Sequence, residues 1–373
     1  MRIAIIHLGR RGAGGKITLE LARALSRGHE VFAFLSNQAE NLQEWQSLPL
    51  HQTHVETYRG AASALASLLF PAQIQRLAGQ IQSAAPDVLL FPMFHPWNAR
   101  LQKILARIPS VVFVHDPRPH PDLAGWFYEK LENLSIRRAT RCAVLSETLK
   151  PHLARRGVGA AFVDVIPLGP FAYPPRVREP IGHPPTALFF GRIVPYKGID
   201  TLLKAFALLR STFDCRLILA GEGDLTPYAD LLTNQPNLEI INRWIPEDEI
   251  SDLFARCDLV VLPYSSASQS GVIPIAAAFG IPVIATRTGG MVEQVEDGLS
   301  GWLVDAGDAS ALADAMRVAF SSNQEARRRG EALKERYATQ FSWERIAERL
   351  EKSLALAAPA RGPIMKRGEG ESK

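Results

Sequence analysis

Residues 186–200 read Thr186-Ala-Leu-Phe-Phe-Gly-Arg-Ile-Val-Pro-Tyr-Lys-Gly-Ile-Asp200, and this stretch predicts the fold of the second half of the chain. The apolar run Ala187–Phe190 has the length of a buried strand, and Pro195 and Gly198 mark the loop that follows it. Apolar residues at helical spacing then continue to Leu209. The stretch is therefore a strand-loop-helix unit, which is the building block of a parallel α/β sheet.

Two cationic residues, Arg192 and Lys197, lie in the loop of this unit. Open parallel sheets bind their ligands outside the carboxyl ends of the strands. Arginine offers a bidentate fork to phosphate oxygens, and lysine supplies a compact charge. Both residues are therefore candidates for binding an anion, and a solvated basic loop is the alternative for these residues taken alone.

The length and composition of the chain predict a soluble protein of about two domains, at ~150 residues each. Of its 373 residues, 47% are hydrophobic and 21% are charged, which is usual for globular proteins. The formal charge of +4 is uneven, because residues 1–183 hold 21 Lys/Arg and 13 Asp/Glu (+8) and residues 184–373 hold 21 and 25 (−4). There is no Lys/Arg stripe interleaved with aromatic residues, so we expect no nucleic-acid partner.

The three cysteines, Cys142, Cys215 and Cys257, are scattered and odd in number. They support neither a disulfide framework nor a zinc site, and they fit a reducing compartment. The chain opens with a predicted strand at Arg2–Leu8, so we expect no signal peptide. No apolar run approaches the ~18 residues that span a bilayer. We therefore expect a cytoplasmic protein whose contact with a membrane, where it occurs, is peripheral.

The amino-terminal residues predict a βαβ unit with a parallel sheet. Strand Arg2–Leu8 is followed by the glycine-rich loop Gly9–Lys16, a helix, and a second strand at Glu30–Leu35. The loop does not have the Gly-x-Gly-x-x-Gly pattern of nicotinamide dinucleotide sites. Gly14 and Gly15 would let the backbone approach a phosphate or a sugar at the helix amino terminus, and a tight turn is the alternative.

A proline-rich segment separates two regions of alternating strands and helices. Seven of the 19 residues from Pro167 to Pro185 are proline, which excludes a helix or a central strand there. We predict two doubly wound α/β domains that face each other across a cleft. The predicted organisation is a first domain at residues 1–170, a linker at 171–185, a second domain at 186–340, a C-terminal helix at 341–357 that packs back on the first domain, and a disordered tail at 358–373.

Four motifs of the second half occur in the order and spacing of one protein family. They are Phe190–Gly198, Leu219–Asp224, Ala276–Thr286 and Gly289–Val304. Together they resemble the donor-binding half of the retaining GT-B glycosyltransferases of family 4, the glycosyl transferases group 1. The first half matches more loosely, through Gly14-Gly15, His115-Asp116 and Ser146-Glu147. The resemblance implies a GT-B fold and transfer of a sugar from a nucleotide donor to an acceptor, with retained configuration and no bound metal.

The resemblance also implies a donor site without a metal ion, and the sequence contains no Asp-x-Asp. Fixed cations and helix amino termini would then stabilise the leaving diphosphate. Arg192 and Lys197 fit this catalytic role, as do the backbone N–H groups of residues 270–272. The donor-binding residues that we assign are Gly14, Gly15, Arg192, Lys197, Gly221, Gln269, Ser270, Gly271, Val272 and Glu293.

Histidines of the first half are assigned by the same resemblance. His115 matches the histidine that family members often place near the reacting sugar, and we assign it a catalytic role. A loop histidine bonded to Asp116 is the alternative for His115. We place His95, Asp116 and His120 on the acceptor side of the site.

The sequence departs from the family at a pair of carboxylates. The family usually has Glu-x7-Glu around residues 267–275, but no acidic residue occurs between Asp258 and Glu293. The loop Ser268-Gln-Ser-Gly271 stands there instead, and Gln269 can bond sugar hydroxyls but carries no charge. This loop and His115–His120 are similar to a branch of the family, so we expect a working variant enzyme. Glu293 would either bond the donor or cap the turn at 289–295.

The expected partners are a UDP- or GDP-linked sugar and a saccharide or lipid-linked acceptor, with no further cofactor, in surface polysaccharide or glycolipid assembly. Arginine pairs at 10–11, 137–138 and 155–156 would give a peripheral contact with an anionic membrane at its inner face, at about 1 kcal/mol per residue. Ordinary solvated surface is the alternative for these pairs. The second hypothesis, motivated by the absent glutamates, is a non-catalytic sugar-nucleotide-binding subunit or scaffold. A dehydrogenase is disfavoured by the glycine pattern.

Overall fold

The structure is a computed structural model of the whole chain. The residues that it describes are 1–10, 12–58, 60, 63–64, 66–67, 71–116, 123–174, 184–233 and 235–358, with no side-chain description at 123–127. Four expectations fall outside these residues in whole or in part: the acceptor-side role of His120, the membrane contact of Arg11, the linker at 171–185 and the tail at 358–373.

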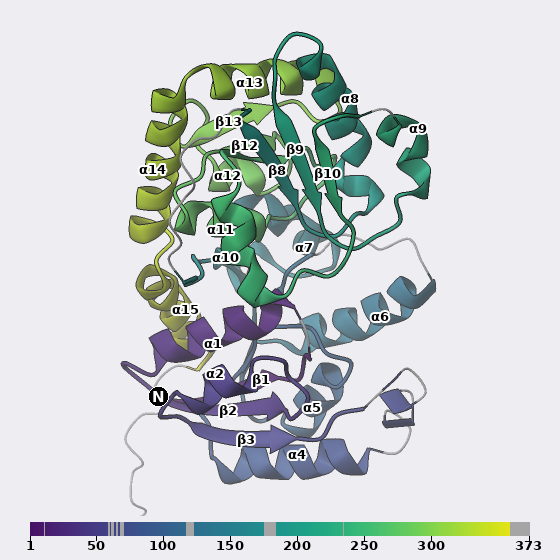
Figure 1. Ribbon diagram of the computed structural model, residues 1–373. Coiled ribbons are helices and arrows are strands. Elements are labelled where there is room, and N and C mark those ends of the chain that lie inside the picture. Colours follow the sequence, from purple (N-terminus) through teal and green to yellow (C-terminus); the bar gives the residue numbers. More distant parts are fainter. Residues whose placement is uncertain are drawn as a thin grey trace, which may run out of the picture.

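The first half of the chain forms a parallel sheet with strand order β3-β2-β1-β4-β5-β6-β7 (Figure 1). Its strands are β1 (Arg2–His7), β2 (Glu30–Ser36), β3 (His51–Val55), β4 (Val88–Phe91), β5 (Ser110–Val114), β6 (Arg141–Val144) and β7 (Val163–Val165). Strands β1 and β4 to β6 are almost wholly buried. Continuous apolar runs of this kind are typical of parallel sheets that are covered on both faces.

The second half forms another parallel sheet, with strand order β10-β9-β8-β11-β12-β13. Its strands are β8 (Thr186–Phe190), β9 (Arg216–Ala220), β10 (Leu238–Ile241), β11 (Leu259–Leu262), β12 (Val283–Thr286) and β13 (Gly301–Val304). The strand order reverses between β8 and β11, which makes the end of β8 a topological switch point. The predicted fold class, two doubly wound α/β domains, is therefore confirmed.

Helices flank both sheets, as Figure 1 shows. In the first half they are α1 (Ala13–Leu25), α2 (Leu42–Gln46), α4 (Ala72–Ser83), α5 (Asn98–Ile104), α6 (Leu123–Arg138) and α7 (Lys150–Arg155). In the second half they are α8 (Ile199–Arg210), α9 (Ala229–Leu232), α10 (Glu247–Ala255), α11 (Val272–Ala278), α12 (Met291–Gln294), α13 (Ala309–Ser321), α14 (Asn323–Thr339) and α15 (Trp343–Ala357). No helix in the described part of the chain is long and apolar enough to cross a membrane.

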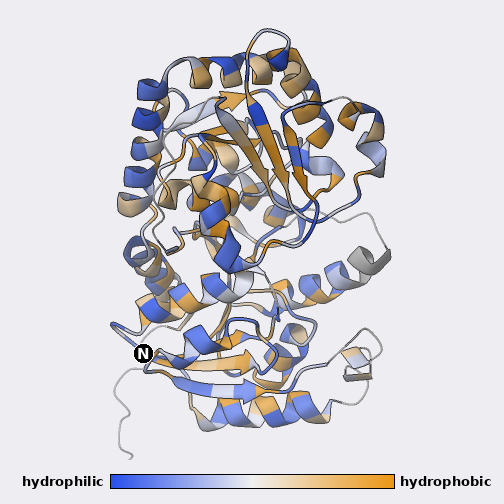
Figure 2. Ribbon diagram, viewed as in Figure 1, coloured by the Kyte–Doolittle hydropathy of each residue, from blue (hydrophilic) through white to orange (hydrophobic). Residues whose placement is uncertain are grey.

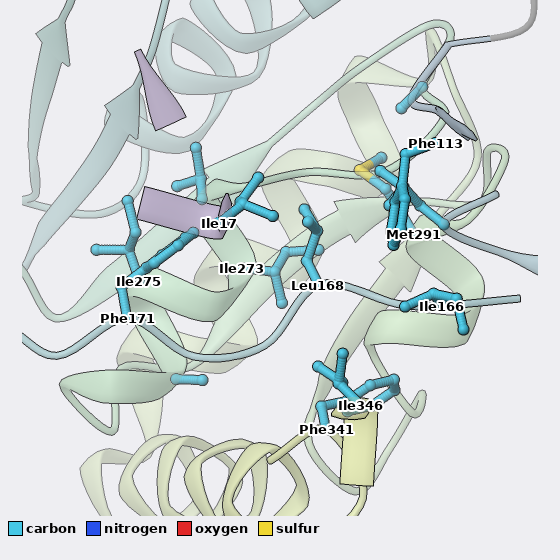
Figure 3. Packing of buried hydrophobic residues seen from close by; sticks show 14 of the residues in the cluster. Ile17, Phe113, Ile166, Leu168, Phe171, Ile273, Ile275, Met291, Phe341 and Ile346 are labelled. Carbon is cyan, nitrogen blue, oxygen red and sulfur yellow. The ribbon is translucent and has the colours of Figure 1, made fainter. Parts of the chain in front are cut away.

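The buried apolar side chains of the two halves form one continuous cluster. Figure 2 shows hydrophobic strands at the centre of the second sheet, whereas polar residues are frequent along α14. Figure 3 shows side chains of both halves within the cluster, among them Ile17 of α1 and Ile275 of α11. Apolar packing between the halves holds the two sheets together as one body.

Helix α15 follows the second sheet in sequence but packs on α1 of the first half. The indole Nε1 of Trp343 donates to the Pro170 carbonyl at 2.6 Å, and Ser353 Oγ donates to Asp164 Oδ2 at 2.6 Å. A Cβ atom on Gly169 would lie 2.7 Å from Cε2 of Trp343, so this close contact requires glycine. The segment near Pro170 and the start of α15 are thus joined.

A close crossing of two turns fixes the loop that carries Arg192. The Gly191 N–H donates to the Ala220 carbonyl at 2.9 Å, and the Ile193 N–H donates to the Glu222 carbonyl at 2.8 Å. Gly221 has φ 144°, and a Cβ atom there would lie 2.0 Å from the Gly191 carbonyl oxygen. The loop after β8 therefore lies directly against the end of β9.

We expect Gly221→Ala to destabilise the fold by about 2–4 kcal/mol, because it adds a backbone clash to an unfavourable φ. Gly307→Ala is the matched control, since Gly307 also has a positive φ (82°) but has no atom within 4 Å of its Cβ position. It should cost only about 1 kcal/mol. The melting temperatures of both variants in scanning calorimetry check this, and equal shifts would contradict the close approach.

Candidate active site

Arg192 and Lys197 lie together in the loop between β8 and α8. The turn Pro195–Lys197 ends at Gly198, whose φ is 67° and whose Cβ position lies 2.0 Å from the Pro263 carbonyl oxygen. This contact holds the loop against the segment after β11. The Lys197 ammonium lies 4.9 Å from the centre of the Tyr264 ring, which is buried. A cation at this distance from an aromatic face is attracted by the ring.

The charge of Lys197 is poorly solvated. The pKa of Lys197 is lowered to about 8, chiefly by burial; Tyr196 opposes this shift, and the positive charge of Arg192 adds a smaller lowering effect. Among the described residues no carboxylate forms an ion pair with Lys197 or with the exposed Arg192. Two cations that repel each other at a topological switch point are suited to binding a polyanion.

The backbone N–H groups at the start of α11 are less available than the sequence predicted. Gln294 accepts the Ser270 N–H at 2.8 Å and donates back to the Ser270 carbonyl at 3.0 Å. Ser270 Oγ accepts the Val272 N–H at 3.2 Å. Of the three predicted N–H donors at 270–272, only that of Gly271 is not used within the described part of the chain. The N–H groups of Ser270 and Val272 are thus engaged within the chain, and their role in binding the donor stays a prediction.

Gln269 lies in the second half of the chain, but its side chain contacts the first half. Its side-chain Nε2 donates to the Leu145 carbonyl, which follows β6 in the first half. Its Oε1 is buried and has no partner among the described residues. A buried acceptor of this kind costs free energy unless a ligand donates to it. If Gln269 binds a sugar hydroxyl, as predicted, the atom available to accept the hydrogen bond is Oε1.

A carboxylate does reach the loop at 268–271, and it comes from the opposite half. Ser268 Oγ donates to Asp116 Oδ1 at 2.7 Å, across 152 residues of sequence. Asp116 follows β5 and Ser268 follows β11, so the carboxyl edges of the two sheets face each other here. The sequence places Asp116 on the acceptor side. In the structure its carboxylate contacts the loop 268–271 of the other half.

Glu293 also spans the two halves. Its carboxylate accepts the backbone N–H groups of Glu147 and Thr148, both at 3.1 Å. These N–H groups open a short helical turn, and a negative charge is favourable at that end. Neither of the two expected roles, a bond to the donor or a cap on its own turn, describes this contact. Glu293 instead caps a turn of the first half.

Three histidines lie at the carboxyl ends of neighbouring strands of the first sheet. His115 Nε2 lies 2.7 Å from the Pro92 carbonyl oxygen and donates to it. Burial lowers the pKa of His115, against the opposing effect of this bond. Burial, with the charge of His115, lowers the pKa of His7 to about 4. Burial, with the charges of His7 and Arg10, lowers the pKa of His95 to about 3. All three are neutral at pH 7.

Gly14 and Gly15 lie in the first turn of α1, where side chains approach them closely. A Cβ atom on Gly14 would lie 2.8 Å from Met93 Cε, and one on Gly15 would lie 2.8 Å from Asn41 Oδ1. Asn41 is buried, and neither polar atom of its amide has a partner among the described residues. The glycines thus make room for side chains of the chain itself. Gly221, another predicted donor-binding glycine, has a packing role as well, and its N–H donates to the Ile241 carbonyl.

Several residues that shape this site have no recognisable signal in the sequence. Tyr264 lies under Lys197, and Gln294 orients the Ser270 peptide while its amide also donates to Tyr337 at 3.0 Å. Lys16 pairs with Glu247 across the two halves. No local pattern marks these residues, because each acts on a partner that is distant in sequence. Among the described residues, no group of His, Cys, Asp and Glu is arranged to hold a metal ion.

The low pKa of Lys197 predicts that anion binding weakens as the pH rises. Between pH 7 and pH 9 the Lys197 ammonium should lose its proton in the free protein, so the Kd for pyrophosphate should rise about tenfold. Lys197→Arg should flatten this profile, since a guanidinium stays charged. Calorimetric titration at several pH values measures it, with Lys204→Arg, an exposed lysine of α8, as the control. A flat profile for the unmodified protein would exclude Lys197 as the titrating group.

Comparison with known proteins agrees with this geometry. The family model for the glycosyl transferase 4-like domain matches residues 12–169, and the model for glycosyl transferases group 1 matches residues 184–322. The GDP-mannose-dependent alpha-(1-6)-phosphatidylinositol monomannoside mannosyltransferase of Mycolicibacterium smegmatis is 26% identical over 75% of this chain and 76% of its own. The N-acetyl-alpha-D-glucosaminyl L-malate synthase of Bacillus anthracis is 30% identical over 42% of this chain. The match spans 41% of that relative, less than half of its length.

Solved structures show the same fold. The structure of HepE from Anabaena, in complex with UDP and glucose, superposes with a TM-score of 0.73 at 19% identity and covers 95% of this chain and 99% of its own. Sucrose-phosphate synthase of Thermosynechococcus elongatus superposes with a TM-score of 0.71 at 19% identity, over 94% and 98% of the two chains. On a GT-B fold, this chain therefore carries a glycosyl transferase 4-like domain followed by a domain of the glycosyl transferases group 1.

Proposed function

We propose that the protein is a retaining, metal-independent glycosyltransferase that moves a sugar from a nucleoside-diphosphate donor to a saccharide or lipid-linked acceptor. One observation carries the proposal. The Lys197 ammonium is desolvated beside Arg192 at the end of β8, and no described carboxylate pairs with either cation. A diphosphate would supply the missing negative charge.

The chemistry assigned to these two cations is stabilisation of the leaving group. When the bond between the sugar and the diphosphate breaks, negative charge grows on the departing phosphate oxygen. Cations that are already in place stabilise this charge without reorganisation during the reaction. Arg192 and Lys197 would supply the positive charge that a divalent cation supplies in other transferases. This supports the metal-independent part of the proposal.

The donor sugar would lie between the loop 268–271 and the end of β5. Gln269 Oε1 would accept a hydrogen bond from a sugar hydroxyl and so lose its buried, unpartnered state. The Asp116 carboxylate, held by Ser268, would stabilise positive charge at the anomeric carbon. Since neutral His115 donates from Nε2 to Pro92, its Nδ1 carries the lone pair and would accept a proton from a hydroxyl group.

The donor base and the pathway are drawn from relatives. HepE was solved with UDP, and the mycobacterial mannosyltransferase is GDP-mannose-dependent, so we propose a UDP- or GDP-linked donor. We propose an acceptor in surface polysaccharide or glycolipid assembly, and the phosphatidylinositol monomannoside in the name of that mannosyltransferase supports the glycolipid. The second candidate is a nucleotide-binding subunit without activity, favoured by the absence of acids between Asp258 and Glu293. It would bind nucleotide without turnover.

Nucleotide binding tests the proposal directly. A diphosphate at 100 times its Kd should stabilise the protein by about 2.7 kcal/mol, visible as a thermal shift with UDP or GDP that EDTA leaves unchanged. Arg192→Ala and Lys197→Ala should abolish the shift and lower turnover about 10²- to 10³-fold. Arg216→Ala, an exposed arginine at the opposite end of β9, is the matched control.

Three outcomes separate the candidates. If no nucleotide shifts the transition, donor binding is excluded and the proposal fails. A shift without turnover on any acceptor would indicate the non-catalytic subunit. A shift that requires added Mg²⁺ would reject the metal-independent mechanism alone.

We also propose a cytoplasmic location with a peripheral contact on an anionic membrane. Arg137 and Arg138 are exposed at the end of α6, whereas Arg156 bonds to Glu132 and Asn133. Arg137 and Arg138 are therefore accessible to an anionic membrane surface, and each would contribute about 1 kcal/mol to the free energy of binding.

Reversing these two charges together, as Arg137→Glu and Arg138→Glu, should abolish co-flotation with liposomes that contain anionic lipid. Arg317→Glu, on α13 of the other half, should leave flotation unchanged. Flotation that is equal in all three proteins, or absent in the unmodified one, would exclude this surface.

A further inference from the structure

A cavity of about 260 Å³ lies in the first half, at the carboxyl edge of its sheet. It is bordered by residues that follow β1, β3 and β4 and by one residue of α6. Its lining includes the side chains of Arg10, Tyr58, Phe94, His95 and Tyr128. None of the residues described as lining the cavity is Asp or Glu, and Arg10 is the single one with a permanent charge.

The cavity lies next to the site already described. His95 follows Pro92 by three residues, and the Pro92 carbonyl accepts the bond from His115. The titration of His95 is coupled to that of His7, and the titration of His7 to that of His115, so the three rings lie near one another. A molecule in the cavity would therefore lie beside His115, where we place the transfer.

The walls of the cavity are aromatic. Tyr58 stacks on His95 with ring centres 5.3 Å apart and an interplanar angle of 20°. Phe94 meets Tyr128 edge to face at 6.0 Å, and 45% of Tyr128 is exposed. Aromatic side chains supply large flat apolar surfaces with a polar tip in the case of tyrosine. Such walls fit a ring that is apolar on one face and carries hydroxyl groups at its edge, as a sugar does.

His95 directs an unused donor toward the cavity. Only 6% of His95 is exposed, and its Nδ1 accepts the Trp97 N–H at 3.3 Å. Neutral imidazole with an acceptor at Nδ1 carries its proton on Nε2. No described residue accepts this proton, although the side chain is more than nine-tenths buried. The Nε2–H group is therefore a donor for a ligand.

Arg10 gives the cavity a positive charge. Its guanidinium lies 5.7 Å from the centre of the Tyr58 ring, and Nη1 donates to the neutral Gln38 amide at 3.1 Å. The Arg10 charge lowers the pKa of both Tyr58 and His95, although burial dominates each shift. A guanidinium with an imidazole N–H in the same cavity selects an anion over a neutral ligand.

We propose that this cavity binds the sugar of the acceptor, and that this sugar carries an anionic group, either a carboxylate or a phosphate. The ring stacks on the aromatic walls, and the anionic group accepts hydrogen bonds from Arg10 and His95. The inference rests on the proposed function, because only a transferase has an acceptor to bind here. It narrows the acceptor to acidic saccharides.

The test is ligand-observed NMR titration of the full chain, without donor, with glucuronate, glucose 6-phosphate and glucose. We expect one or both anionic sugars to bind about tenfold more tightly than glucose, as one charge-assisted bond would give. The better anionic probe distinguishes carboxylate from phosphate. In Arg10→Gln this preference should disappear.

Two further variants keep the test specific. His95→Asn retains an acceptor for the Trp97 N–H but lacks the Nε2–H donor, so both anionic sugars should bind more weakly. Arg107→Gln, which removes an exposed charge outside the cavity, should bind like the unmodified protein. The thermal shift with UDP or GDP, measured on each variant, shows that the protein is folded and that the donor site is intact.

Glucose that binds as tightly as the anionic sugars would overturn the inference, and so would an unchanged preference in Arg10→Gln. If nucleotide binds but no sugar does, the assignment of the cavity to the acceptor is wrong, and the assignment of the donor site is unaffected. If neither nucleotide nor sugar binds, the proposed function fails together with it.

Discussion

The candidate active site depends on one constraint, a half-buried ammonium group that pairs with no described carboxylate. Lys197 lies against Tyr264 and Gly191, and its loop is held by the close approach of Gly191 to Gly221. These contacts, between backbones or with a buried ring, hold the loop in place beside the charge. The protein therefore holds positive charge in place for a ligand, which is the condition for electrostatic stabilisation of a transition state.

Three acids make contacts between the two halves. Asp116 reaches Ser268, Glu293 reaches the turn at 147–148, and Lys16 pairs with Glu247. The loop 268–271 has no acid of its own, but it acquires a carboxylate when the two sheets are in contact. The proposed donor site would thus have a carboxylate at this loop only in this arrangement of the halves.

The sequence was sufficient where the signal was local. The apolar run before Gly191 predicted β8 within one residue, and the alternation of strands and helices predicted the fold class. No helix was predicted over Asn323–Thr339, because in α14 only Gly330, Leu333 and Tyr337 are buried and the apolar period is weak. The site was harder to predict for another reason. The bond from the Ser270 N–H to Gln294 spans 24 residues, and no pattern in a single sequence shows such a pairing.

The contact between Trp343 and the Gly169–Pro170 segment joins the two connections between the halves. The backbone passes between the halves twice, once after Pro170 and once before Trp343, and the bond from the indole to the Pro170 carbonyl brings these two passages together. Because the two passages are adjacent, any rotation of one half relative to the other would turn about this point, which would act as a pivot. A small rotation at the pivot becomes a displacement at Asp116 and Ser268 that grows with their distance from it. Glycine at 169 keeps the pivot tight, since any side chain there would press against the indole.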